Sequence, residues 1–279
     1  MSDTRANSLS GNLDLVCAWD PARGSYLARQ SFSAPVHLSK SYWDGESLLV
    51  HVVNQTAGFF GGDTIRVNVA VEPGASLVLS SPSAARYHPS QGRETRIQQS
   101  FQIRAGGSLE VYPEISIPQR DSRSSQQSKI HIEEGGELIF LETLSPGRVA
   151  SGEVFAFENY SWRTDIHVDD RLVHRERASL SPRESRLAGL KALFPNSYYA
   201  GFVIISPAAA KWDDDFLHSV KNLSKELKAR CAASKLHAHG YSIRLLAADS
   251  LALRDGICRL RELIYRGIKR RMPDVRRSV

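Results

Sequence analysis

The sequence has few cysteines and no long hydrophobic run. Its three cysteines, Cys17, Cys231 and Cys258, are odd in number and far apart, which fits neither a disulfide framework nor a zinc ribbon. We interpret them as reduced thiols that take part in packing. The longest apolar runs, LLVHVV and GFVIISPAAA, are shorter than the ~20 residues of a membrane helix, and the opening residues contain no apolar core of signal-peptide length. We therefore expect a cytoplasmic protein.

Common motifs of catalysis and phosphate binding are also missing. No serine stands in a GxSxG elbow, and no histidine is evident as a partner for Cys231 or Cys258, which we expect in or near helices. The glycine cluster TAGFFGGD leads into a strand pattern, whereas a phosphate loop needs a lysine, a serine or threonine, and a helix. The nine histidines show no helical i, i+4 spacing. A hydrolase, a nucleotide-binding protein and a tight metal site are therefore disfavoured.

Positive charge is present in excess near the end of the chain, where the formal net charge of +6 is concentrated. Eight basic residues lie close together there: Arg259, Arg261, Arg266, Lys269, Arg270, Arg271, Arg276 and Arg277. With only Glu262 and Asp274 among them, this segment carries the whole surplus. It predicts a solvated helix face that meets an acidic protein partner. A basic-tail binder of nucleic acid or of an anionic surface is the alternative, although Tyr265 is the only aromatic residue among the arginines.

Three segments share one pattern, in which alternating apolar residues lead into a polar turn with glycine and then a leucine three positions later. The glycine and leucine pairs are Gly74 and Leu77, Gly106 and Leu109, and Gly135 and Leu138. A weaker fourth copy spans Asp165 to Glu176. Alternation is typical of strands with one buried face, and such turns are typical of β-hairpins. Because one strand pair cannot bury its own face, we expect the units to stack into a superhelical, β-helix-like body; an ordinary β-sandwich is the alternative.

Helical spacing replaces this alternation near the C-terminus. A first amphipathic helix follows a run of aspartates and places four apolar residues on one face: Phe216, Val220, Leu223 and Leu227. A second follows the strand pattern YSIRLLA and a cap at Asp249, and continues to Pro273; its apolar residues are Leu253, Ile257, Leu260 and Ile264. We therefore expect an N-terminal segment at 1–24, a mainly β body at 25–205, and a part with two α-helices and a basic tail at 206–279.

Acidic residues beside the turns are candidate ligands for a passing ion. They are Asp63, Glu114, Glu142, Glu153 and Glu176. Oxygen sites that are not preorganised hold divalent ions weakly, so transient binding is predicted and a structural ion is not. A carbohydrate-active β-solenoid enzyme is a second interpretation, with Glu142 and Glu176 as the two carboxylates that glycoside hydrolysis needs.

Several stretches, in order, resemble the urease accessory protein D family. NQTAGFFGGD is similar to the family's NPTGGLLGGD type of signature, YPEISIPQRDS to its LPQPTIPF stretch, and GRVASGEVF to its GRPASGE stretch. The resemblance covers residues 25–270. The chain departs from the family pattern at Ala57, at the aromatic pair Phe59 and Phe60, at Tyr112 and at Gln119, which puts in question whether partner surfaces and channel width are kept.

The resemblance implies a non-catalytic scaffold without a permanently bound cofactor. It further implies a superhelical β-structure that binds urease apoprotein, accessory protein F and the GTPase accessory protein G, and through which nickel passes transiently. The family motifs fall on Thr56, Gly58, Gly61, Gly62 and Asp63; on Pro113, Glu114, Ile117 and Pro118; and on Gly147, Arg148, Ser151, Gly152 and Glu153. Of the carboxylates, we expect Asp63, Glu114 and Glu176 to line a nickel path.

Overall fold

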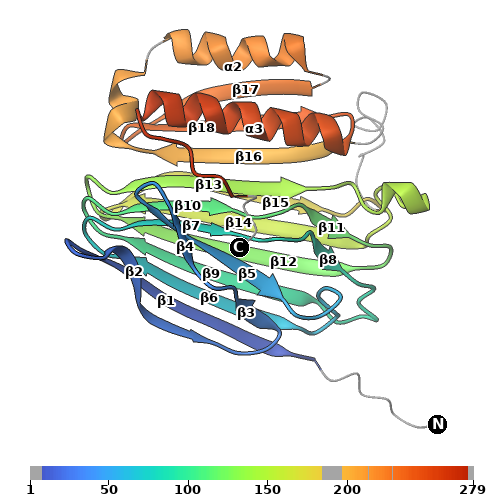
Figure 1. Ribbon diagram of the computed structural model, residues 1–279. Helices are drawn as coiled ribbons and strands as arrows, with labels where there is room; N and C mark the ends of the chain where they lie inside the picture. Colours follow the sequence, from blue (N-terminus) through green and yellow to red (C-terminus); the bar gives the residue numbers. More distant parts are fainter. Residues whose placement is uncertain (1–7, 184–196, 213, 228, 276–279) are drawn as a thin grey trace.

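The computed structural model describes residues 8–183, 197–212, 214–227 and 229–275. Its strands form a β-solenoid of about four turns (Figure 1). A seven-stranded sheet has the order β15 (Arg171–Leu180), β14 (Asn159–Val168), β12 (Arg123–Ile132), β9 (Thr95–Ile103), β6 (Thr64–Val71), β1 (Ser10–Asp20) and β2 (Gly24–Phe32). An eleven-stranded sheet has the main order β17 (Ala229–Leu236), β18 (Gly240–Ala247), β16 (Tyr198–Ile205), β13 (Glu137–Leu144), β10 (Ser108–Tyr112), β7 (Ser76–Ser80), β5 (Ser47–Asn54) and β3 (Val36–Leu38). The short strands β4 (Tyr42–Asp44), β8 (Ala85–Tyr87) and β11 (Ser116–Pro118) pair beside this path.

Parallel pairing in register stacks the repeats on one another. Leu109 lies beside Leu77 on one side and Leu138 on the other, so the leucines of the first three units form a ladder in the second sheet. Val69, Phe101, Ile130 and Ile166 form the matching ladder in the first sheet. Both ladders face the core between the sheets. The superhelical β-body predicted from the repeat is therefore confirmed.

The prediction that each unit is a hairpin is wrong for the first three units. The two strands on either side of Gly74, β6 and β7, belong to different sheets, so the turn connects the layers. The turns stack as the strands do: the Gly74 amide donates to the Gly106 carbonyl at 3.2 Å, and the Gly106 amide to the Gly135 carbonyl at 3.2 Å. Only the fourth unit is a hairpin, in which β14 and β15 pair antiparallel across Asp169. This hairpin ends the parallel stacking of the seven-stranded sheet.

The β body extends beyond the boundaries that the sequence suggests. Strand β1 pairs with both β2 and β6, so residues 10–20 form part of the seven-stranded sheet instead of a separate N-terminal segment. At the other end, β16 pairs with β18, so the eleven-stranded sheet continues past residue 205.

Two helices cover the outer face of the eleven-stranded sheet at its β16–β18 end (Figure 1). Helix α2 (Asp214–Glu226) and helix α3 (Ser250–Gly267) bury the apolar faces that their spacing predicts, although α3 ends before Pro273. The Asp249 side chain caps α3 by accepting from the Ala252 amide at 2.8 Å. Cys231 lies in strand β17 beside α2, where its amide donates to the Ser224 hydroxyl at 2.7 Å, and Cys258 lies in α3, so the expectation that both lie in or near helices is confirmed. All three cysteines are free. No helix in the described ranges is long and apolar enough to cross a membrane.

Three arginines of the basic C-terminal segment attach it to the β body. Arg261 is 3% exposed and binds the Glu110 carboxylate through two hydrogen bonds of 2.6 and 2.7 Å. Arg270 pairs with Glu137, and Arg271 pairs with Asp44 at 2.6 Å. The expectation of a solvated face is wrong for Arg261, which is buried, whereas the Arg271 side chain is 71% exposed. The acidic partners of all three arginines come from strands far away in sequence. Asp213, Lys228, Arg276 and Arg277 lie outside the described residues.

Candidate functional site

The motif loops, which are far apart in sequence, stack along one side of the solenoid. The Phe59 amide donates to the Arg86 carbonyl at 2.7 Å, and the Gln119 amide donates to the Tyr87 carbonyl at 3.0 Å. The Ser145 amide donates to the Ser116 carbonyl at 2.8 Å. Each loop therefore hydrogen-bonds to the corresponding loop of a neighbouring turn, and the sequence motifs together form a continuous stack.

Two glycines of the first loop are required by close backbone contacts. A Cβ atom on Gly58 would lie 2.4 Å from the Arg86 carbonyl oxygen, and one on Gly61 would lie 2.2 Å from the Ser90 carbonyl oxygen. The Thr56 hydroxyl donates to the Gly58 carbonyl at 2.6 Å. Gly62 follows with a positive φ of 94°. The glycine cluster is therefore a tight corner that lets the loops stack.

Asp63 holds this corner together through its side chain. Its Oδ1 accepts from the Leu9 amide and its Oδ2 from the Phe60 amide, both at 2.8 Å, and the residue is 1% exposed. Both oxygens are thus used by the main chain. Asp63 does not border the cavity described below.

The third motif is a loop closed by an ion pair. Arg148 donates to both Glu153 oxygens, at 2.9 and 2.5 Å, and the Arg120 amide adds a third hydrogen bond at 3.1 Å. The hydrogen bonds from Arg148 are the main reason that the pKa of Glu153 is lowered. Gly147 has no room for a Cβ, which would lie 2.4 Å from the Glu153 carbonyl. Ser151 ends the short helix η1 (Val149–Ser151), and Gly152 follows with a φ of 73°.

A cavity of about 160 Å³ lies between the two sheets beside these loops. Polar groups on its wall include Asn54, Gln99, Glu114, Gln126 and Glu142. Pro113 and Glu114 border it between β10 and β11, and the Glu114 carbonyl accepts from the Thr143 hydroxyl at 3.2 Å. Ile117 and Pro118 lie in β11 and pair with β8. The cavity therefore connects a motif loop to the polar interior.

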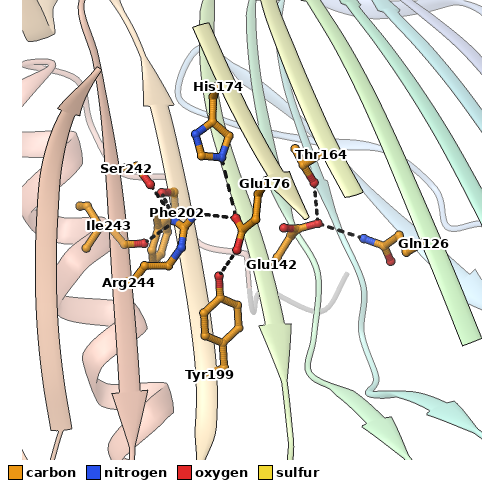
Figure 2. Close-up of polar contacts among 10 residues, drawn as sticks. All are labelled: Gln126, Glu142, Thr164, His174, Glu176, Tyr199, Phe202, Ser242, Ile243 and Arg244. Atoms are coloured by element: carbon orange, nitrogen blue, oxygen red, sulfur yellow. Dashed lines mark hydrogen bonds and ion pairs between the residues drawn. The ribbon is translucent and has the colours of Figure 1, made fainter. Parts of the chain in front are cut away.

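Glu142, on β13, points from the eleven-stranded sheet toward the seven-stranded one (Figure 2). Its Oε1 accepts from the Thr164 hydroxyl at 2.9 Å and from the Gln126 amide at 3.3 Å. Part of the side chain borders the cavity, but protein surrounds it. This burial, with a smaller contribution from the negative charge of Glu176, raises the pKa of Glu142 from 4.5 to about 7. The group therefore exchanges a proton near neutral pH.

Glu176, on β15, lies in the same interior network but is held by a cation (Figure 2). Arg244 pairs with its Oε2, the Tyr199 hydroxyl donates to its Oε1 at 2.9 Å, and His174 Nε2 lies 3.8 Å from Oε2. Burial alone would raise the pKa of Glu176, but His174, Arg244 and Tyr199 outweigh it, and the pKa is lowered. One carboxylate thus stays charged beside another that is easily protonated.

Comparison with known proteins gives this geometry a context. A sequence model of the UreD urease accessory protein family matches residues 9–277. The chain belongs to this family. A urease accessory protein UreD of Opitutus terrae is 35% identical over 271 residues, covering 96% of this chain and 98% of its own. A protein of the same name from Staphylococcus aureus is 24% identical over 246 residues, which cover 85% of this chain and 86% of its own length. One from Staphylococcus epidermidis is 24% identical over 222 residues, which cover 79% of this chain and 80% of its own length.

The carboxylates that the family resemblance singled out therefore have different surroundings in this UreD-family chain. Glu114 borders the cavity, and Glu176 reaches the network around Glu142. Asp63 and Glu153 instead close loops. Sequence reasoning missed the network partners Gln126, Thr164, His174, Tyr199 and Arg244. Arg244 gave a signal, because a charged residue inside the apolar strand pattern YSIRLLA indicates a buried partner.

Proposed function

We propose that this UreD-family chain is a non-catalytic scaffold of urease maturation that passes nickel toward urease through the interior of its solenoid. In this proposal it binds the urease apoprotein, accessory protein F and the GTPase accessory protein G. Membership of the family supports the role in urease maturation. The observation that most supports the nickel path is the cavity between the sheets, with the Glu142 carboxyl on its wall.

The chemistry of that wall suits an ion in transit. Ni²⁺ accepts oxygen and nitrogen ligands, and a path must bind the ion weakly enough to release it. Glu142 offers an oxygen that is only partly ionised at neutral pH, and Gln126, Asn54 and Glu114 offer further oxygens along the cavity. Such ligands do not form a tight cage. No cluster of three or more metal-binding side chains occurs among the residues that the structure describes.

The alternative is a carbohydrate-active enzyme. The pair of carboxylates Glu142 and Glu176 favours it, but their surroundings do not. Glycoside hydrolysis needs two carboxyl groups on either side of a bound sugar. Glu142 instead faces the space between the sheets, and Glu176 is occupied by Arg244 and Tyr199. We therefore favour the scaffold.

The proposal is tested by co-expressing this chain with the urease structural subunits and accessory proteins F and G. We expect the chain to co-elute with these proteins in a pull-down and urease activity to depend on the chain. If the chain remained separate and urease matured equally well without it, the proposed scaffold would be refuted.

A further inference from the structure

The outer face of the seven-stranded sheet is polar and basic, and no helix among the described residues packs on it. Side chains at alternate positions point away from the core here, because their neighbours in sequence, such as Ile65, Val67 and Ile130, lie in the core between the sheets. Both described helices pack on the other sheet. The basic residues of this outer face are Arg29, Arg66, Arg96, Arg123, Lys129, Arg163, Arg175 and Arg177.

Few acids oppose these cations. Asp165 is shared by Arg163 and Arg175, whose Nη2 and Nε lie 2.5 and 2.6 Å from its oxygens. At the border, Arg96 pairs with Glu94, and Arg123 pairs with Glu158.

Four exposed cations of this outer face have no acidic partner among the residues that the structure describes. They are Arg29, Arg66, Lys129 and Arg177. The Arg66 guanidinium donates to the neutral Gln98 side chain at 3.4 Å.

Part of the unpaired positive charge of the described residues lies on this outer face, away from the basic C-terminal segment. In sequence, the positive surplus lies at the C-terminus, but in space Arg261, Arg270 and Arg271 are neutralised by acids of the β body. The unpaired cations of the outer face are single residues on separate strands of the seven-stranded sheet: Arg29 on β2, Arg66 on β6, Lys129 on β12 and Arg177 on β15. A linear count of charge does not detect them, because they lie far apart in sequence.

We propose that the outer face of the seven-stranded sheet binds an acidic surface of a partner protein. The face spans six adjacent strands from β1 to β15, about 24 Å across and about 26 Å along the strands, which approaches one side of an ordinary protein interface. A shallow hollow of about 240 Å³ is lined by Arg66 and Lys129 together with neutral polar side chains. A carboxylate entering this hollow meets two cations that have no acid of their own.

The composition of the face distinguishes a protein from other occupants. Nucleic acids bind basic surfaces on which aromatic rings stack on the bases, whereas the outward positions of β6, β9, β12 and β14 carry no Phe, Tyr or Trp. Asp14 and Asp165 on the face would repel a continuous row of phosphates, while an interface with mixed charges can accommodate them. A second copy of this chain is disfavoured, because its own basic face would be repelled.

The test compares two triple charge reversals that change the net charge equally. The first, Arg66→Glu with Lys129→Glu and Arg177→Glu, alters the proposed face. The second, Lys221→Glu with Lys225→Glu and Lys235→Glu, alters exposed lysines on α2 and β17. Binding of a fluorescein-labelled peptide of about 20 glutamates is measured by anisotropy at about 25 and about 250 mM NaCl. Circular dichroism checks that each variant is folded.

We expect the wild-type chain to bind the peptide, with affinity falling at the higher salt concentration. The first variant should bind at least about tenfold more weakly, whereas the control variant should bind as the wild type does. The milder triple change to glutamine should weaken binding in the same direction, which guards against a folding artefact. Equal weakening by the control, no wild-type binding, or tighter binding of a 20-nucleotide poly-dT would overturn the proposal. None of these results depends on nickel or urease, so the proposed function is tested separately.

Discussion

Two glutamates on opposite faces of the eleven-stranded sheet differ in whether a cation pairs directly with the carboxylate. Glu110, on β10, faces α3, and its carboxylate is bound by Arg261 and by the Tyr265 hydroxyl at 2.7 Å. Glu142, on β13, faces the cavity, and its hydrogen bonds within the described part of the chain come from the neutral groups of Thr164 and Gln126. On the face toward α3, Glu110 therefore forms an ion pair with Arg261. On the face toward the cavity, these hydrogen-bond partners of Glu142 are neutral.

This difference separates a structural role from a functional one. The Glu110 ion pair connects α3 to the solenoid, and the same guanidinium also donates to the Pro273 carbonyl at 2.8 Å, which positions the end of the chain. A buried charge without a cation costs stability, so Glu142 gives the fold little that a neutral residue would not. We infer that the cavity-side carboxyl is kept for what it binds. The comparison leads to three predictions of decreasing size.

The largest effect is expected from Glu110→Gln. The change leaves the Arg261 charge buried without its partner, which typically costs about 3–5 kcal/mol. We predict a loss of that order in the free energy of unfolding, measured by urea denaturation. The double change Glu110→Leu with Arg261→Met should recover most of the loss, because it removes both charges. A loss below about 1 kcal/mol for the single change would show that Glu110 is not an essential attachment.

Glu142→Gln should have the opposite sign. The folded protein keeps the Glu142 proton up to about pH 7, whereas the unfolded chain releases it near pH 4.5. The stability that this group contributes is therefore present below pH 4.5 and is lost as the pH rises to 7. Glutamine accepts the same two hydrogen bonds without a charge, so the variant should be more stable at pH 8 by up to about 3 kcal/mol.

Urea unfolding of wild type and Glu142→Gln at pH 5 and pH 8 measures this difference. The gain should shrink strongly at pH 5, where wild-type Glu142 is already mostly protonated. A variant that was less stable at pH 8 would mean that the ionised carboxylate stabilises the fold.

Arg259→Ala should have the smallest effect. This arginine, in the same helix as Arg261, pairs with Asp255 at 3.2 Å and with Glu226 at 2.8 Å, but its side chain is 41% exposed. Exposed pairs contribute about 0.5 kcal/mol, so thermal unfolding should barely change. A large destabilisation would contradict the distinction between the buried and the exposed arginines of α3.

The sequence predicts the stacking well because the repeat itself encodes it. The leucines after Gly74, Gly106 and Gly135 align in register, and the two helical faces follow from apolar spacing. The turns were misread as hairpins because a glycine turn permits either connection. Which strand pairs with which depends on a partner about thirty residues away.

The site is less predictable, since its members come from separate strands. Motif positions identified loops that do stack, but they did not show that the Asp63 oxygens are used by the main chain. The proximity of Glu142 to Glu176 and Arg244 required the register of β13, β15, β16 and β18. Likewise, the basic C-terminal segment found its acids on β4, β10 and β13, which no local pattern indicates.

The central claim, that the Glu142 carboxyl is kept for nickel passage, is tested most directly by nickel-dependent activation of urease in the co-expressed complex. Glu142→Gln is compared with Glu134→Gln, an exposed turn position, at equal amounts of assembled complex. We predict that the Glu142 variant assembles normally yet activates urease several-fold less, while the Glu134 variant activates it fully. Normal assembly with full activation by Glu142→Gln would contradict the claim.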